Sequence, residues 1–253
     1  MILLLRLLPL LVAAANVALF WLQTRQPATY PFIACVGIAL VPAASFLISW
    51  RRIKLADLLE KMTPTFVLLL ALGFGLLLTE RTPAVVTLIA IAAISTYLSL
   101  ELLFLLAYNP AAYPVNGLSR VNMAYVPIAV WYAMSTSAGL LVFLHVSRVI
   151  HVCIATGLGA LLFRTTEHPG ASRRQHIVWM LVGILVGAEI GWIELLLPLN
   201  MGMQGIVAAL LLTAALRVRR YLYDPKPSRQ TAWSEAAAVG LLFIGAASTA
   251  TWL

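Results

Sequence analysis

The sequence predicts an all-α fold, a polytopic bundle of about nine transmembrane helices, and three observations support this prediction. Hydrophobic residues make up 62% of the chain and charged residues only 10%, whereas soluble domains carry about 25% charged residues. Apolar stretches of about 17 to 25 residues recur from end to end, each long enough to cross a hydrocarbon core of about 30 Å. No polar connection is long enough to form a soluble domain, so residues 1–253 are predicted to be a single integral membrane domain.

Each apolar segment is predicted to be a helix, because a chain in lipid must satisfy its own backbone hydrogen bonds. Closed membrane barrels show an alternation of polar and apolar residues that this sequence does not have. Prolines stand at or near many of the segment boundaries, as residues that interrupt helices should. The predicted spans are residues 7–23, 31–50, 62–79, 84–107, 123–145, 148–164, 176–197, 200–216 and 235–252.

Basic residues predict the orientation of the bundle. With the N-terminus in the cytoplasm, fourteen of the 17 lysines and arginines fall on the inner side, and only Arg25, Arg81 and Arg148 fall outside. This asymmetry is the positive-inside pattern expected of a multi-pass protein of the bacterial cytoplasmic membrane. Residues 123–164 are read as a hairpin, because one long helix would carry the eight basic residues that follow to the outer side.

Composition excludes several classes of function. The two cysteines, Cys35 and Cys153, lie in apolar segments, which argues against a disulfide framework or a thiolate metal site. The net charge of +8 is assigned to inner loops in contact with anionic lipid, and nucleic acid is not an expected partner. The sequence has no phosphate-binding glycine loop, nucleophile elbow or HExxH zinc motif. No cofactor and no metal are expected.

Two glutamates inside the predicted spans are the main candidates for chemistry. Glu189 lies about 19 Å from the inner end of its helix, and Glu101 lies about two turns from the inner end of the fourth span. A charge at the bilayer centre costs at least about 2.5 to 3.5 kcal/mol, so such residues usually face the bundle interior or a wet cavity. We expect Glu189 to be buried. A dry carboxyl holds a proton, which suits a proton-coupled carrier as well as a buried structural pair.

Glu194 is predicted to lie at the outer interface. It follows Glu189 by five positions and lies about 140° around the helix from it, so the two acids do not share a face. The predicted outer turn carries His145, Arg148 and His151, which form a polar cluster at the same membrane level. The expected contact is a salt bridge from Glu194 to Arg148. A zinc site is disfavoured, because HxxRxxH does not match the i, i+4 histidine pair of helical zinc sites.

Gly183 and Gly187 form a GxxxG motif on the same predicted helix as Glu189. Small residues at this spacing let two helices approach closely. This helix is therefore expected to be central in the bundle. Two inner loops, TTEHPGASRRQH and RVRRYLYDPKPSRQ, are basic, and they could hold a lipid phosphate for an intramembrane transferase. Contact with anionic lipid is the favoured interpretation.

The C-terminal part carries an acid, a tryptophan, the letters LPLN, an apolar helix and the basic, aromatic exit RVRRYLYD. This pattern resembles the C-terminal part of an uncharacterised family of polytopic membrane proteins from reduced-genome candidate-phylum bacteria. The resemblance covers about a fifth of the chain, and it implies that this hairpin is the family's core feature but implies no activity or substrate. The residues that carry it are Glu189, Trp192, Leu197, Pro198, Arg219, Arg220 and Tyr221.

The leading functional expectation is a non-enzymatic membrane component that binds lipid, a partner membrane protein or a second copy of itself as a homo-oligomer. The alternative is a proton-coupled transporter of small solutes that uses Glu189 and Glu101. An intramembrane lipid-modifying enzyme comes third. The sequence leaves the substrate, the ligand and the oligomeric state open.

Overall fold

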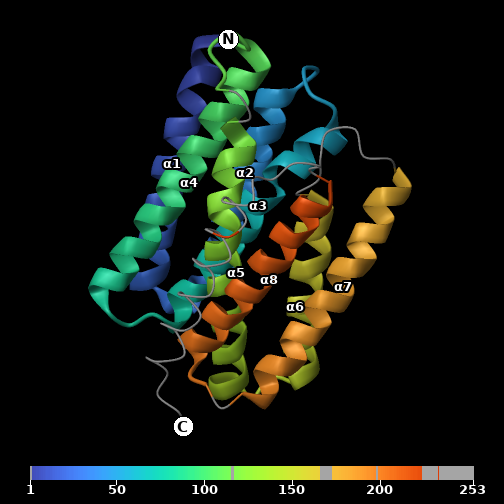
Figure 1. Cartoon of the computed structure of the whole chain (residues 1–253). Coiled ribbons are helices and arrows are strands. Elements are labelled where there is room, and N and C mark those ends of the chain that lie inside the picture. The colour runs from blue at the N-terminus through green and yellow to red at the C-terminus, as the bar shows by residue number, and fades with distance from the viewer. Residues whose placement is uncertain (1, 115–116, 166–172, 198, 224–232, 234–253) are drawn as a thin grey trace. The chain divides into compact units, whose positions relative to one another are not determined.

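The computed structural model describes residues 2–114, 117–165, 173–197, 199–223 and 233, and over these residues it contains helices and no strand. Seven of the described helices are long and apolar enough to cross a membrane, as expected for an all-helical membrane fold. Figure 1 shows the helices in chain order: α1 (Ile2–Arg25), α2 (Tyr30–Ser49), α3 (Leu55–Gly75), α4 (Thr82–Tyr108), α5 (Gly117–Leu144), α6 (Arg148–Thr165), α7 (Arg173–Leu196) and α8 (Met201–Tyr223).

The seven candidate spans differ in number from the nine predicted. They comprise α1 to α5, α7 and α8. Helix α6 coincides with the predicted span 148–164, although it is not among the seven. The ninth predicted span, 235–252, lies outside the described residues.

Helix α3 begins earlier than predicted, at Leu55 rather than at residue 62. The carboxylate of Asp57 in its first turn stabilises the positive end of the helix dipole. Leu58 and Met62 are both buried, because residues four apart share a face of the helix. Charged residues on the exposed face therefore do not end this helix, and a search for apolar runs alone misses its first two turns.

The predicted turn between the fifth and sixth helices is confirmed. Helix α5 ends at Leu144 and α6 begins at Arg148. His145 has a φ of 52°, in the left-handed region that few residues other than glycine adopt. Ser137 of α5 contacts His151 of α6, so the two helices fold back on each other. A histidine thus reverses the chain where the sequence offers neither glycine nor proline.

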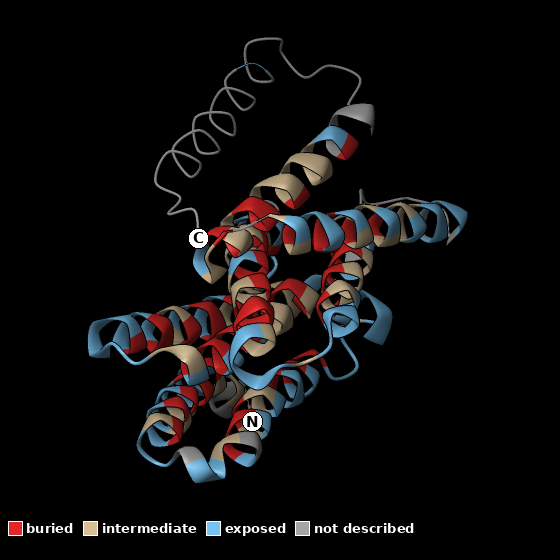
Figure 2. Ribbon diagram, turned by 90° about the horizontal axis from the view of Figure 1, so that it is seen from below, coloured by how far each residue is buried: buried red, intermediate tan, exposed pale blue. Residues whose placement is uncertain are grey.

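The chain divides into two compact units, residues 1–125 and residues 126–253, here called unit 1 and unit 2. The boundary falls within α5. Each unit is described by itself below. Within each, buried residues form stripes along the helices and exposed residues occupy the opposite faces (Figure 2). The expectation of one membrane domain over the whole chain stays a prediction.

Unit 1 is built around α1, which packs most extensively against α4 and α2 (Figure 1). Its helices are joined by polar contacts inside an apolar core. The Asn16 side-chain amide of α1 donates to the Thr96 hydroxyl of α4 over 3.2 Å. The Gln23 side-chain amide of α1 donates to the Gly73 carbonyl of α3 over 2.9 Å. Such bonds between transmembrane helices contribute about 0.6 to 2 kcal/mol each.

In unit 2, the most extensive helix contact is between α6 and α7. Glycines on both helices make this close contact possible. A Cβ atom added at Gly183 or Gly187 would clash with the backbone carbonyl of Gly159 or Ala155, respectively, on α6. The two backbones therefore touch directly, as the small residues of a GxxxG motif allow.

Helices α5 and α8 of unit 2 also approach closely. The Trp131 indole N–H of α5 donates to the Gly202 carbonyl of α8 over 3.2 Å. A Cβ atom at Gly205 of α8 would clash with Ser135 and with the Trp131 carbonyl. The Asn200 side-chain oxygen accepts from the Met203 backbone N–H over 3.0 Å and so caps the first turn of α8.

Candidate functional site

The candidate site is a chain of three buried polar side chains in unit 2. The Nε2 atom of His151 lies 3.1 Å from the Oε2 atom of Glu194. The Nδ1 atom of His151 lies 3.0 Å from the Ser137 hydroxyl oxygen. Ser137 is 3% exposed, His151 1% and Glu194 0%. The imidazole therefore joins a hydroxyl on α5 to a carboxyl on α7, away from solvent.

Helical phase explains why these residues meet. On α7, Glu194 follows Gly187 by seven residues, or two turns less about 20°, so it lies on the same face as the glycines that pack against α6. On α6, His151 begins a buried stripe that continues through Ala155, Leu158 and Leu162. The facing stripes of α6 and α7 thus bring the imidazole and the carboxyl together.

Glu194 also contacts α8 of unit 2. Its backbone carbonyl accepts from the Gln204 side chain of α8 over 3.3 Å. Its Oε1 atom is buried and accepts no hydrogen bond from the described residues. One turn further into the helices lies a cavity of about 10 Å³, lined by apolar residues that include Ala155 and Ile190. That volume is near the minimum for one water molecule, and its lining offers no side-chain polar group to hold one.

The predicted outer polar cluster is only partly assembled. Glu194 bonds to His151, not to Arg148 as predicted. Arg148 and His145 are both exposed, and no described contact joins either one to Glu194. The position of each residue on α6 explains the difference. His151 lies on the buried stripe of the helix, whereas Arg148 is its first residue and is exposed.

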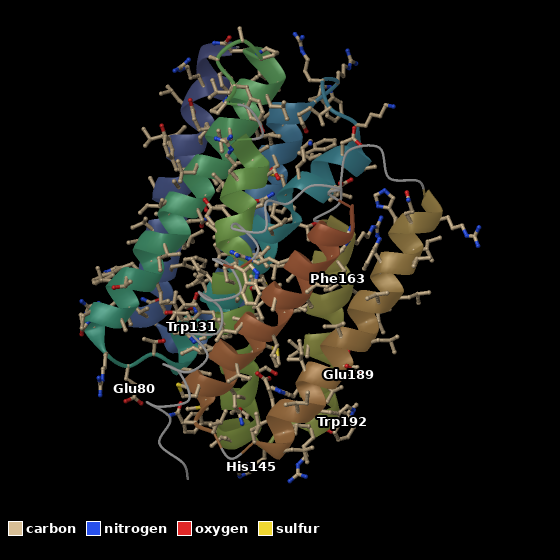
Figure 3. All side chains as sticks on the ribbon, in the orientation of Figure 1. Glu80, Trp131, His145, Phe163, Glu189 and Trp192 are labelled. Atoms are coloured by element: carbon tan, nitrogen blue, oxygen red, sulfur yellow. The ribbon has the colours of Figure 1, made fainter. Side chains whose placement is uncertain are left out.

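The burial of the two acids on α7 is the reverse of the prediction. Glu194 is buried, whereas Glu189 is exposed. Glu189 follows Gly187 by two residues, or about 200° around the helix, which puts it opposite the glycine face. Figure 3 labels Glu189 and Trp192 on α7, and Trp192 is 57% exposed. A GxxxG motif on a helix therefore does not imply that every residue of that helix is buried.

Glu101 is half-buried on α4 of unit 1. Tyr97, one turn earlier on the same face, is 39% exposed, whereas Ser95 is 1% exposed. No hydrogen bond or ion pair to Glu101 is present among the described residues of unit 1.

Sequence reasoning missed the third member of the polar chain. Ser137 lies in the stretch MSTSAG, where small residues indicate close packing and nothing else marks it. The missed signal is proximity across the turn: Ser137 lies eight residues before the reversal at His145, and His151 lies six residues after it. It also missed Asn16 and Gln23, which are buried polar residues inside the first span.

Arg219 forms a second buried polar cluster in unit 2 and is 6% exposed. Its guanidinium, on α8, donates to the Phe163 carbonyl of α6. It also lies over the Trp179 ring of α7, 4.8 Å from the ring centroid, and over the Phe163 ring at 5.9 Å. Cation–π contacts of this kind contribute about 0.5 to 2 kcal/mol. The arrangement fastens the end of α8 to α6 and α7.

The chemistry available to the Ser137, His151 and Glu194 chain is proton binding. Imidazole and carboxyl both gain and lose protons, and the hydroxyl donates or accepts as required. The described residues contain no group of three or more histidine, cysteine, aspartate or glutamate side chains placed to hold a metal ion.

No known protein family, curated protein or solved structure matches the chain. The resemblance of its C-terminal part to polytopic proteins of candidate-phylum bacteria therefore stays a prediction. The fold defines a class: the seven long apolar helices are those of a multi-pass helical membrane protein.

Proposed function

We propose that the protein is a non-enzymatic component of the bacterial cytoplasmic membrane that binds another membrane protein through the exposed face of α7. The observation that supports this proposal is the exposure of Glu189 within a candidate span. Glu189 lies seven residues before Leu196, or about 10 Å from the end of the helix. A charge in lipid costs about 2.5 to 3.5 kcal/mol at the bilayer centre. A partner that binds this carboxyl would offset the cost.

The residues around Glu189 form a stripe suited to helix packing. Exposed side chains recur at intervals of three or four residues, the spacing at which one helix packs against another. Apart from Glu189 the stripe is apolar. Its members are Val178, Leu181, Leu185, Glu189, Trp192 and Leu196.

The carboxyl determines the chemistry of the partner. We infer a transmembrane helix that presents a hydrogen-bond donor opposite Glu189, from a serine, threonine, asparagine, histidine or basic side chain. A lipid acyl chain offers no donor and therefore does not satisfy this carboxyl. One such bond between helices contributes about 1 to 2 kcal/mol, equivalent to a roughly fivefold to thirtyfold change in binding.

A photo-crosslinking amino acid at Leu185 or Trp192, in the full chain in native membranes, tests this proposal. Both positions should give one adduct with the same protein, and mass spectrometry should find a donor residue in the crosslinked helix. Glu189→Leu should reduce the yield roughly fivefold to thirtyfold, and Glu189→Gln should retain most of it. A crosslinker at Ile94 of α4, which is 58% exposed, is the matched control.

Three outcomes would contradict the proposal. Lipid adducts alone at both positions would mean that no protein covers the stripe. A crosslink within one chain would mean that another segment of this protein covers it. A crosslinked dimer would assign the stripe to self-association instead.

The finer topology is part of the same proposal. We propose nine spans with the N-terminus in the cytoplasm, supported by the fourteen basic residues that this orientation collects on the inner side. The inner loops then contact anionic lipid. A proton-coupled carrier that uses Glu189 and Glu101 stays an alternative, although no contact of these two glutamates favours it. A lipid-modifying enzyme is the third possibility.

A further inference from the structure

We propose that Ser137, His151 and Glu194 form a proton-binding site inside the membrane that takes up and releases one proton as a unit. This proposal is independent of the partner-binding stripe, which lies on the opposite face of α7. It rests on the two hydrogen bonds, the burial of all three side chains and the chemistry of a hydroxyl next to an imidazole.

The two distances allow two proton arrangements. In the first, the neutral imidazole donates from Nε2 to the ionised carboxylate, and the Ser137 hydroxyl donates to Nδ1. This form has a net charge of −1. In the second, one further proton is bound at Nδ1, which now donates to the Ser137 oxygen. Both hydrogen bonds are retained, and the net charge becomes zero.

Burial favours uptake of the further proton. An isolated buried charge is strongly disfavoured, whereas an imidazolium beside a carboxylate is a compensated pair. The Oε1 atom of Glu194 accepts no hydrogen bond from the described residues, so one of the two carboxylate oxygens has no donor to stabilise the anionic form. Proton uptake by the pair therefore removes a net buried charge, an effect that neither residue would show alone.

Ser137 makes the exchange possible without repacking. A hydroxyl can donate in one form and accept in the other by rotating its hydrogen. A carbonyl in its place could only accept, and a backbone N–H could only donate. The hydroxyl leaves no polar atom of the imidazole unpaired in either form.

Other titratable groups near the site are few. On α6, Arg148 is exposed one turn before His151 and Cys153 is exposed two residues after it. His145 is exposed in the turn, and on α7 Glu189 is exposed on the opposite face. The part of α5 in unit 2 contributes Tyr132, which is half-buried and on another face from Ser137. The described charged residues of α8, Arg217 and Arg219, lie about 20 Å along that helix from Gln204.

The site lies close to the helix ends on one side only, so the path for a proton is short on that side. His151 is three residues from the start of α6 and Glu194 two residues from the end of α7, so both lie within about 5 Å of the helix ends. In the other direction lies the small apolar cavity near Ala155 and Ile190. Protons therefore exchange on the side of the turn that holds His145 (Figure 3).

The order of hydroxyl, imidazole and carboxyl also occurs in serine hydrolases, where the hydroxyl is a nucleophile. Here the Ser137 hydroxyl is buried, and the adjacent cavity, about 10 Å³, does not include it in its lining. An ester has no room beside this oxygen. The geometry therefore points to proton binding rather than to acyl transfer.

Infrared and histidine ¹⁵N spectra of the full protein in lipid nanodiscs, recorded against pH, test the site. The imidazole signal of His151, identified by its loss in His151→Gln, should change in a single one-proton step. In Glu194→Gln, the proton affinity of His151 should fall at least tenfold, because groups that share a site titrate together. In Ser137→Ala the protonated imidazole loses its acceptor, and the affinity should fall by a smaller factor.

Glu189→Gln is the matched control, because Glu189 is on the same helix and exposed, and it should leave the His151 signal unchanged. A His151 signal that stays constant from about pH 4 to 9 would overturn the proposal and leave the chain a fixed structural contact. Reaction of Ser137 with a fluorophosphonate would overturn it in favour of a nucleophilic serine. If His151→Gln fails to fold, replacing the other three histidines by glutamine assigns the His151 signal, and its titration then decides between these results.

Discussion

Gly183 of α7 and Gly159 of α6 face each other so closely that a Cβ atom on either residue would clash with the carbonyl oxygen of the other. Helix backbones meet without intervening side chains, so the packing of α6 on α7 depends on the absence of two methyl groups. This contact also holds the imidazole of His151 and the carboxyl of Glu194 in register.

The first prediction concerns this contact. Gly183→Ala should lower the free energy of unfolding by about 1 to 3 kcal/mol, because a backbone carbonyl cannot move aside as a side chain can. Titration with denaturing detergent measures it. Gly157→Ala is the matched control: a Cβ there meets nothing within 4 Å, and alanine should stabilise the helix by about 0.5 to 1 kcal/mol. Equal effects of the two changes would refute close backbone packing.

The second prediction concerns the bond between Ser137 and His151. A double-mutant cycle with Ser137→Ala and His151→Gln should give a coupling free energy of about 0.5 to 2 kcal/mol. Ser45→Ala is the matched control, because the Ser45 hydroxyl donates to the Val41 carbonyl of its own helix. It should change stability by less than about 0.5 kcal/mol. Strict additivity in the cycle would mean that the two side chains do not interact.

The third prediction concerns α1 and α4. Thr96→Val should destabilise unit 1 by about 1 to 2 kcal/mol, because it leaves the buried Asn16 amide without its acceptor. Adding Asn16→Leu should restore most of this loss, since removing both partners leaves no unpaired polar group. Thermal unfolding of the wild type, the single variant and the double variant measures these two effects. A double variant less stable than the Thr96→Val single variant would contradict it.

The fourth prediction concerns topology. In right-side-out cells, a membrane-impermeant maleimide should label a cysteine at Glu80 and should not label one at Lys54 until the membrane is opened. Both residues are exposed and lie between helices. Cys35 and Cys153 should be replaced by serine beforehand. Labelling of the Lys54 position alone in intact cells would reverse the proposed orientation.

Most of the helices could be predicted from the sequence, because an apolar run of about 20 residues has few alternatives in lipid. The start of α3 could not, because Lys54, Asp57 and Lys61 interrupt the apolar run. Asp57 and Lys61 lie on the exposed face of the helix, and hydropathy does not distinguish such a face from a loop. The distribution of basic residues along the chain predicts the turn before Arg148, whereas the local sequence does not.

The candidate site was only half predictable. The sequence makes Glu194 and His151 both candidates, but opposite charge favours Arg148 as the partner of Glu194. The phase of the glycines contained a better criterion: Gly187 and Glu194 are seven residues apart and share a face, whereas Glu189 is about 200° away. Ser137 could not be recognised, because a hydroxyl becomes part of a site only through the fold.

The contact of Gly159 with Gly183 has a further consequence for permeation. Two backbones in direct contact leave no space for water or a lipid chain between α6 and α7 along the glycine stripe. The helix pair instead borders a small cavity, lined by residues that include Met134, Leu158, Ile190 and Leu212, whose volume of about 10 Å³ is near the minimum for one water molecule.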